Sequence, residues 1–147
     1  MRADAAQIVI NTSEAQEQVA GDFTPIPEDL YATKVIDAKL EETKQDGWPM
    51  YTYTLQVQDG EHRGRNLWHR RPIIPAGQSK KSTVGFVKGD AKGLGLTVPV
   101  QTTVLDLARF MVREGFGRLV GVVVGFGKGD YADRNEVKSL VPIEKLG

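Results

Sequence analysis

The chain has 147 residues, enough for one domain with a buried core, and its apolar (40%) and charged (26%) fractions are those of an ordinary globular protein. It contains no cysteine, which excludes disulfides, thiolate zinc sites, iron–sulfur clusters and cysteine nucleophiles. The sequence also lacks an apolar run that approaches the roughly 18 residues of a membrane span, and it shows no secretory signal. We therefore expect a cytoplasmic protein with no membrane partner.

The net charge of zero conceals an uneven distribution of charge. Residues 1–29 carry one basic and six acidic residues, so the remainder carries 18 basic and 13 acidic ones. Residues 62–89 contain no acid and seven basic residues, namely Arg63, Arg65, Arg70, Arg71, Lys80, Lys81 and Lys88. Such a segment is typical of a phosphate-binding surface, although a solvated face balanced elsewhere is the alternative interpretation.

Three strands are predicted in the first half of the chain. Residues 1–22 are polar and acidic and predict a mobile arm ahead of a domain that spans residues 23–147. Residues 30–40 alternate between apolar and polar and predict a strand. Its expected buried face holds Leu30, Ala32, Ile36, Ala38 and Leu40. Residues 49–58 alternate more cleanly, and residues 65–74 form a third strand that prolines end.

A helical segment follows the third strand. Residues 83–96 predict a short helix that four glycines weaken. Residues 103–114 predict a better one, because Thr103 can cap it with Asp106 three residues later, and Gly115 can follow its last turn.

The last part of the chain predicts a hairpin. Residues 118–126 are rich in β-branched side chains, residues 127–135 form a polar loop, and residues 136–143 form a fifth strand. The OB-fold places a helix between strands three and four of a five-stranded barrel, which is the order found here. We therefore predict an all-β fold, a five-stranded OB-type barrel with a helical insert. A small split-sheet α+β domain is the alternative.

Patterns typical of catalysis or metal binding are not found. His62 and His69 lie seven residues apart with no HxH or HExxH spacing, so we expect no metal site. The glycine-rich stretch 85–95 lacks the GxxxxGK[ST] spacing of a phosphate-binding loop, and no serine lies in a nucleophile-elbow context. We expect no enzyme activity and no cofactor.

Aromatic and basic residues are the remaining candidates for function. Binding of single strands needs cations along a track and flat side chains on which bases stack. On an OB-type barrel, strands two and three and two hairpin loops form the binding groove. The candidates on these elements, and on the linker after strand three, are Trp48, Arg63, Arg65, Trp68, Arg70, Lys80, Lys81, Lys128, Tyr131 and Arg134.

Several aromatic residues have an alternative role in the core. Tyr51 and Tyr53 share a face with Leu55 and Val57, so core packing is favoured over stacking on bases. Trp68 is equally compatible with a core position and with an exposed one. The phenylalanines at 110, 116 and 126 are assigned to the core.

Three segments resemble a family of small bacteriophage proteins regarded as single-stranded-DNA-binding OB proteins, often encoded near recombination and replication genes. They read LYATKVIDAKLEETK, VQDGEHRGRNLW and NEVKSLVP. The matching positions are Gly60, Gly64, Arg65, Leu67, Trp68, Asn135 and Val137. The resemblance implies an OB-fold, DNA binding and no catalysis. It also implies a phage origin and therefore a location in the cytoplasm of the host cell. Bacterial single-stranded-DNA-binding proteins typically carry an acidic C-terminal tail, whereas the acidic segment here is N-terminal.

The expected function is sequence-tolerant binding of single-stranded DNA, or of RNA, in phage replication or recombination. A homo-oligomer and recombination or replication proteins as partners are also expected. The alternatives are a protein-interaction module that docks on a replication, recombination or host-defence protein, and a barrel that binds a small ligand. A further hypothesis is that the acidic arm folds over the basic groove when DNA is absent.

Overall fold

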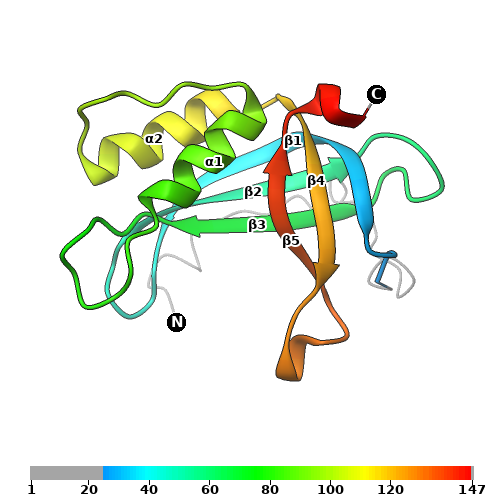
Figure 1. Ribbon diagram of the computed structural model, residues 1–147, viewed down its shortest axis with the longest axis horizontal. Helices are drawn as coiled ribbons and strands as arrows, with labels where there is room; N and C mark the ends of the chain where they lie inside the picture. The colour runs from blue at the N-terminus through cyan, green and yellow to red at the C-terminus, as the bar shows by residue number, and fades with distance from the viewer. Residues whose placement is uncertain (1–24, 147) are drawn as a thin grey trace, which may run out of the picture.

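One long strand, β1 (Asp29–Glu42), joins the two halves of the sheet in the computed structural model, which describes residues 25–146 (Figure 1). Its first residues, Asp29 to Lys34, pair with β4 (Leu119–Phe126), and Thr33 to Glu42 pair with β2 (Pro49–Val57). β3 (Asn66–Pro72) then pairs with β2, and β5 (Asn135–Val141) pairs with β4. The result is an antiparallel five-stranded sheet in the order β3-β2-β1-β4-β5.

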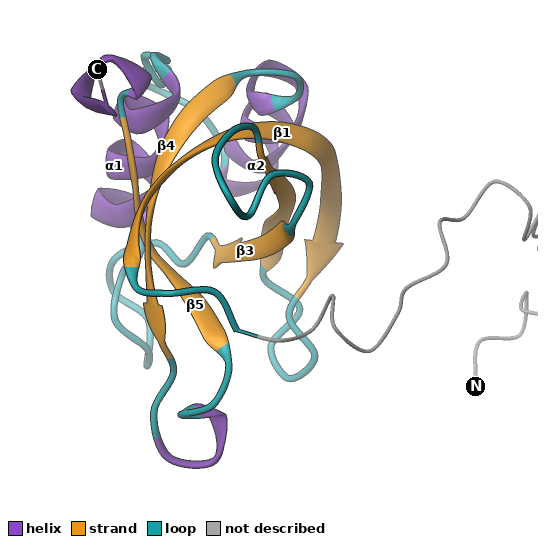
Figure 2. Ribbon diagram, turned by 90° about the vertical axis from the view of Figure 1, so that its right-hand side faces the viewer, coloured by secondary structure: helices purple, strands orange, loops and turns teal. Residues whose placement is uncertain are grey.

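The sheet is strongly curved. β4 and β5 run steeply across the direction of β2 and β3 in Figure 1, and Figure 2 shows β1 arching around β3. A bulge between Val35 and Asp37 lies in the part of β1 where the strand passes from one half of the sheet to the other. The curvature brings Cα atoms of β3 and β5, the two edges of the sheet, within 8 Å of each other.

The buried side of β1 is the reverse of the predicted one ahead of the bulge. Thr33 and Val35 are completely buried, whereas Ile36 is 36% exposed. Leu40, which lies beyond the bulge, is 43% exposed and is therefore not buried as predicted either. Thr33 tolerates burial because its hydroxyl donates to the carbonyl oxygen of Val120 at 2.9 Å. The bulge then shifts the alternation, so that Ala38 packs against the core as predicted.

Two helices lie between β3 and β4 in the chain, α1 (Val84–Leu94) and α2 (Val104–Gly115). α1 packs on β5 and α2 on β2 and β1. The predicted cap of the second helix is confirmed, because the Thr103 Oγ1 accepts the Asp106 backbone N–H at 3.0 Å. The other helical turns are the short 3-10 segments Gly129–Tyr131 and Ile143–Leu146.

The core lies between the inner face of the sheet and the helices. Tyr51 and Tyr53 are completely buried, in agreement with the core interpretation. Phe116 is 58% exposed, so its assignment to the core is wrong; it is the residue at which α2 ends, just before the turn into β4.

The predominantly β architecture expected from the sequence is confirmed, and it is compatible with an OB-fold. The predicted arm, residues 1–22, lies outside the described residues. Within residues 25–146, no helix has the length and apolar character required to cross a membrane.

Candidate nucleic-acid interface

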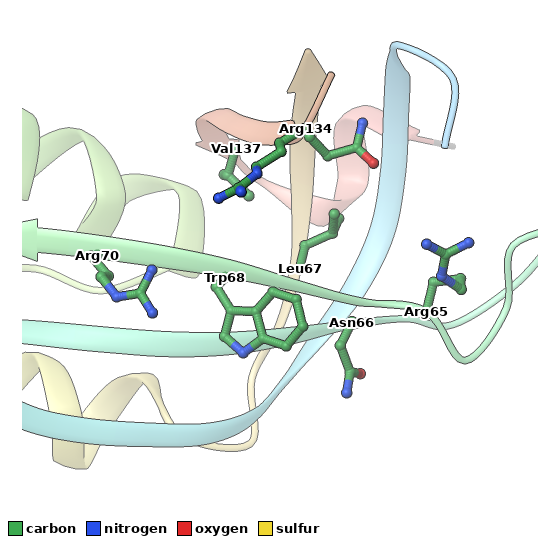
Figure 3. A pocket seen from close by; sticks show the side chains of 8 residues that line it. Arg65, Asn66, Leu67, Trp68, Arg70, Arg134 and Val137 are labelled. Atoms are coloured by element: carbon green, nitrogen blue, oxygen red, sulfur yellow. The ribbon is translucent and has the colours of Figure 1, made fainter. Parts of the chain in front are cut away.

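A cavity of about 520 Å³, here called the edge pocket, opens between the edge strands β3 and β5 (Figure 3). Three arginines and a tryptophan lie among its lining residues, and the described lining contains no acid. The lining residues are Arg65, Asn66, Leu67, Trp68, Arg70, Arg134, Asn135 and Val137. Four of the predicted candidates, from two segments far apart in the chain, are therefore brought together.

The alternation of β3 determines which side chains face outward. Leu67 and His69 are buried, whereas Trp68 between them is 49% exposed. Arg70 is exposed on the same face as Trp68, as expected two residues farther along a strand. Trp68 therefore occupies the exposed position, and the core alternative is wrong for this residue.

The backbone of β3 has unpaired directions along the edge of the sheet at alternate residues. The Val57 N–H donates to the Arg65 carbonyl oxygen at 2.9 Å, and the Ile73 N–H donates to that of Pro49 at 2.8 Å. In an antiparallel ladder, alternate residues bond to the neighbouring strand, so the residues between them point their N–H and C=O groups away from β2. Asn66, Trp68 and Arg70 are the residues directed in this way, toward the open edge.

The hairpin between β4 and β5 supplies the opposite wall. Its base is closed by the Gly127 N–H, which donates to the Arg134 carbonyl oxygen at 3.0 Å. The guanidinium carbon of Arg134 lies 5.3 Å from the centroid of the Tyr131 ring, which is 60% exposed. This cation–π contact orients the arginine that lines the edge pocket. Lys128 is exposed in the same hairpin.

The remaining candidates lie elsewhere. The turn from β1 to β2 and the loop before α1 lie together at one end of β2 and β3, and the turn between β2 and β3 lies at the other (Figure 1). Lys80 pairs with Asp46 at 2.8 Å at the first end, where Trp48 and Lys81 also belong. Trp48 precedes Pro49, whose carbonyl oxygen accepts the Ile73 N–H. Ile73 lies eight residues after Arg65, which corresponds to about 26 Å along an extended strand.

Arg63 is at the second end, exposed in the turn before β3, but it does not line the edge pocket. The structure thus divides the predicted site into a group at the edge pocket and a group at the opposite end of the sheet.

Two asparagines of the edge pocket were not among the predicted candidates. Asn66 shares the outward face with Trp68 and Arg70, so strand parity alone could have identified it. Asn135 begins β5, and its side chain binds both backbone groups of Ile26, with the Ile26 N–H donating to Oδ1 at 2.8 Å and Nδ2 donating to the Ile26 carbonyl oxygen at 2.9 Å. No local pattern could have paired residues 109 positions apart.

A buried polar cluster, which the sequence did not suggest, lies behind β3. Asp90 on α1 is 3% exposed, and its Oδ2 accepts the Tyr51 hydroxyl at 2.5 Å and the Arg71 Nε–H at 3.1 Å. The Nε2 of His69 lies 2.8 Å from the same oxygen. The cluster attaches α1 to the inner face of the strand whose outer face carries Trp68.

The environment of Asp90 favours its charged form. Burial by itself raises the pKa of this carboxyl, but the hydrogen bonds from His69, Arg71 and Tyr51, together with the electrostatic attraction of His69, outweigh it and hold the pKa below its usual value. Burial and the neighbouring Asp90 raise the pKa of Tyr51, which therefore stays protonated and donates its hydrogen bond. The cluster is thus a satisfied structural network.

No group of three or more histidine, aspartate and glutamate side chains suited to a metal ion occurs in the described part of the chain.

Comparison with known proteins places the chain in one family. No curated protein matches it. The family model with the description "Protein of unknown function (DUF669)" matches residues 11–144. This match covers both edge strands, both helices and the whole sheet, and the chain therefore belongs to that family.

Proposed function

We propose that this protein is an OB-type barrel that binds single-stranded nucleic acid, with little sequence preference, at the edge pocket. The observation that carries the proposal is an exposed tryptophan, Trp68, in a pocket lined by Arg65, Arg70 and Arg134. Binding of this kind combines cations for the phosphates with an aromatic surface for the bases.

The OB-type assignment is supported by the arrangement of the strands. β1 is shared by two halves of a curved sheet, the two edge strands approach each other, and the helices connect β3 to β4. In such barrels the strand faces next to the hairpin loops bind oligonucleotides. The edge pocket lies on β3 and beside the β4–β5 hairpin, which corresponds to that location.

A single strand fits this surface better than a duplex. The indole of Trp68 needs an unstacked base, whereas the bases of a duplex are stacked on one another. The surrounding guanidinium groups can form charge-assisted hydrogen bonds with phosphate oxygens. The resemblance to phage single-stranded-DNA-binding proteins extends the proposal to DNA in phage replication or recombination.

The proposal is tested by fluorescence anisotropy with a labelled oligo(dT) and a matched duplex at low salt. Trp68→Ala should weaken binding of the single strand by about 1–3 kcal/mol, roughly 5- to 150-fold, because one base loses its stacking partner. Trp68→Phe should retain most of the affinity, since phenylalanine also offers an aromatic face.

Phe116→Ala provides the matched control, because this exposed aromatic residue does not line the edge pocket. Its affinity for oligo(dT) should equal that of the unaltered protein. The proposal is abandoned if the unaltered protein does not bind the single strand at low salt, or if Trp68→Ala and Phe116→Ala have equal effects.

A further inference from the structure

An exposed phenylalanine lies beside the end of β3, outside the edge pocket. Phe86, in the first turn of α1, is 62% exposed. The guanidinium carbon of Arg71 lies over its ring, 5.1 Å from the centroid, in a cation–π contact. The same arrangement occurs at the edge pocket, where Arg134 lies over the exposed ring of Tyr131.

The position of the Phe86 ring is fixed from two sides. α1 begins beside the end of β3 (Figure 1), where the Oγ1 of Thr83, its N-cap residue, accepts the Ile74 N–H at 2.9 Å. Arg71 is bound by the buried Asp90, which lies one helical turn after Phe86 on the same face of α1. Ring and arginine are therefore held in place before any ligand binds, which lowers the entropy cost of binding.

Packing gives little reason for a phenylalanine at this position. Apolar side chains stabilise a fold by burial, and a residue that is 62% exposed contributes little in this way. The ion pair behind the ring does not depend on it, because two guanidinium nitrogens of Arg71 already bind Asp90 at 3.1 and 3.4 Å. An aromatic ring with a cation on one face leaves its other face for a ligand.

The ring also continues the path of the edge pocket along β3. Trp68 and Arg70 line that pocket, and Arg71 is the next residue of the strand. β3 is an edge of the sheet, so a ligand can pass from its outer face, which carries Trp68, to the side on which α1 carries Phe86. Residues 62–89, which include both rings, contain seven basic residues and no acid.

The spacing of the two rings suits a strand of several nucleotides. Trp68 and Arg71 are three residues apart, which corresponds to about 10 Å along a strand. Stacked bases in one strand are about 3.4 Å apart, so this distance corresponds to about three nucleotide steps. A single strand that contacts both rings therefore carries further nucleotides between the two stacked bases.

We infer that Phe86, with Arg71 behind it, is a second base-stacking site, and that a single strand bound in the edge pocket continues over the end of β3 to reach it. This inference rests on the proposed function and extends it from one stacked base to a strand of several nucleotides. The second site accepts any sequence, because every base has a π-face. Arg70, between the two sites, is available to the phosphates.

The first test measures the affinity for an oligo(dT) of about 16 nucleotides, the upper end of the site size of one OB-fold, by anisotropy at low salt. Phe86→Ala should weaken binding about 5- to 150-fold, the range for loss of one stacked base. Phe86→Tyr should retain most of the affinity. Phe86→Leu, which keeps the apolar bulk without the aromatic face, should lose it. Phe116→Ala remains the control and should have no effect.

The second test uses the unaltered protein and locates the strand on it. An oligo(dT) in which iodouracil replaces thymine crosslinks, on irradiation, to aromatic side chains that lie against the base. Trypsin separates the three exposed aromatic residues into the peptides 66–70 with Trp68, 82–88 with Phe86 and 114–118 with Phe116. Mass spectrometry should find crosslinks in the first two peptides and none in the third.

The proposed function and the second site fail in different ways. If the unaltered protein does not bind the single strand, the proposed function fails and the second site fails with it. If Trp68→Ala weakens binding while Phe86→Ala equals Phe116→Ala, the edge pocket stands and the second site is overturned. An affinity of Phe86→Leu equal to that of the unaltered protein would also overturn it, because the side chain would then act by apolar contact alone.

Discussion

At the scale of single residues, Asp90 is the most constrained charge among the described residues. One carboxylate serves Tyr51, His69 and Arg71 and lies in a buried position on α1. Removing one partner of a buried charge pair leaves the others desolvated and uncompensated, which typically costs about 3–5 kcal/mol. We therefore expect Asp90→Asn to lower the free energy of unfolding by about this amount near neutral pH.

The same residue predicts a dependence of stability on pH. The pKa of Asp90 is lower in the folded chain than in the unfolded one, where it is about 3.9. Its stabilising contribution is therefore complete above that pH and is lost as the pH falls through the folded-state pKa. Urea unfolding at a series of pH values should show the deficit of Asp90→Asn shrinking in this acid range.

Asp106→Asn is the control for this experiment, because Asp106 is an exposed aspartate whose ion pair with Arg109 is 3.5 Å long. Its unfolding should follow that of the unaltered protein across the whole range. A deficit of Asp90→Asn that does not depend on pH would contradict the role given to the carboxylate charge.

Residue identity alone could not have revealed this cluster. Asp90 follows a glycine within a weak helical pattern, and its partners come from β2 and β3, up to 39 positions away. The exposure of Trp68, by contrast, follows from strand parity once Leu67 and His69 are known to face inward. The sequence alone does not decide which face of β3 is buried. In the structure His69 is buried beside Asp90, so Trp68 lies on the opposite, exposed face.

At the scale of elements, α2 is positioned by contact between a glycine and a tyrosine. The Tyr53 hydroxyl donates to the Met111 carbonyl oxygen at 2.6 Å, which fixes the ring against the last turn of the helix. A Cβ atom on Gly115 would lie 2.8 Å from the Cζ of that ring. Gly115 is thus the last residue of α2, and its missing side chain leaves room for the Tyr53 ring. The sequence instead predicts that Gly115 follows the helix.

Two glycine-to-alanine substitutions should therefore change stability in opposite directions. Gly115→Ala should destabilise the protein by about 1–3 kcal/mol, because the buried ring has no room to move. Gly85→Ala on α1 should stabilise it by about 0.4–1 kcal/mol, because a Cβ there meets no atom within 4 Å and the unfolded chain loses freedom. Thermal unfolding of both variants measures the two shifts, and a Gly115→Ala variant as stable as the unaltered protein would contradict this account of α2.

The elements themselves were largely predictable from the sequence, because alternation, caps and turn residues are local signals. The helix α1 was predicted only weakly, since its glycines lower helix propensity. One of them, Gly93, is needed because a Cβ there would lie 2.7 Å from the Leu140 carbonyl group. The reversed face of β1 was not predictable, because a bulge interrupts the period of two on which the pattern depends.

At the scale of the whole molecule, the zero net charge means that any attraction for nucleic acid must come from a local concentration of cations. The edge pocket has three arginines in its lining. For a single strand, the logarithm of affinity falls with the logarithm of salt with a slope of about −0.7 per phosphate neutralised, so three contacts predict a slope of about −2.

Substitution of one pocket arginine should lower the size of this slope. Arg134→Ala should reduce it by about 0.7, whereas Arg109→Ala, an exposed arginine on α2, should leave it unchanged. Anisotropy titrations between about 50 and 200 mM salt measure both slopes. Equal slopes for the two variants would remove Arg134 from the proposed phosphate contacts.

The edge pocket could be predicted only in part, because it exists through the approach of strands that are far apart in the chain. Trp68 and the arginines of β3 stand out as an aromatic and basic run, but their meeting with Arg134 depends on the curvature of the sheet. Trp48, Lys80 and Lys81 have the same chemistry in the sequence, and only the direction of the strands separates them from that group.

The shared strand β1 also has a consequence for the order in which the chain folds. Thr33 pairs with Val57 on one side and with Val120 on the other, at a separation of 87 residues. The near partner is brought in by a short hairpin, whereas closing the distant contact costs about 4 kcal/mol of chain entropy at this length. The meander of β1, β2 and β3 can therefore assemble early, with the outer edge of β1 left open until the helices and the β4–β5 hairpin dock. A nascent chain released before residue 119 would expose that unpaired edge, at which a second chain could add a strand.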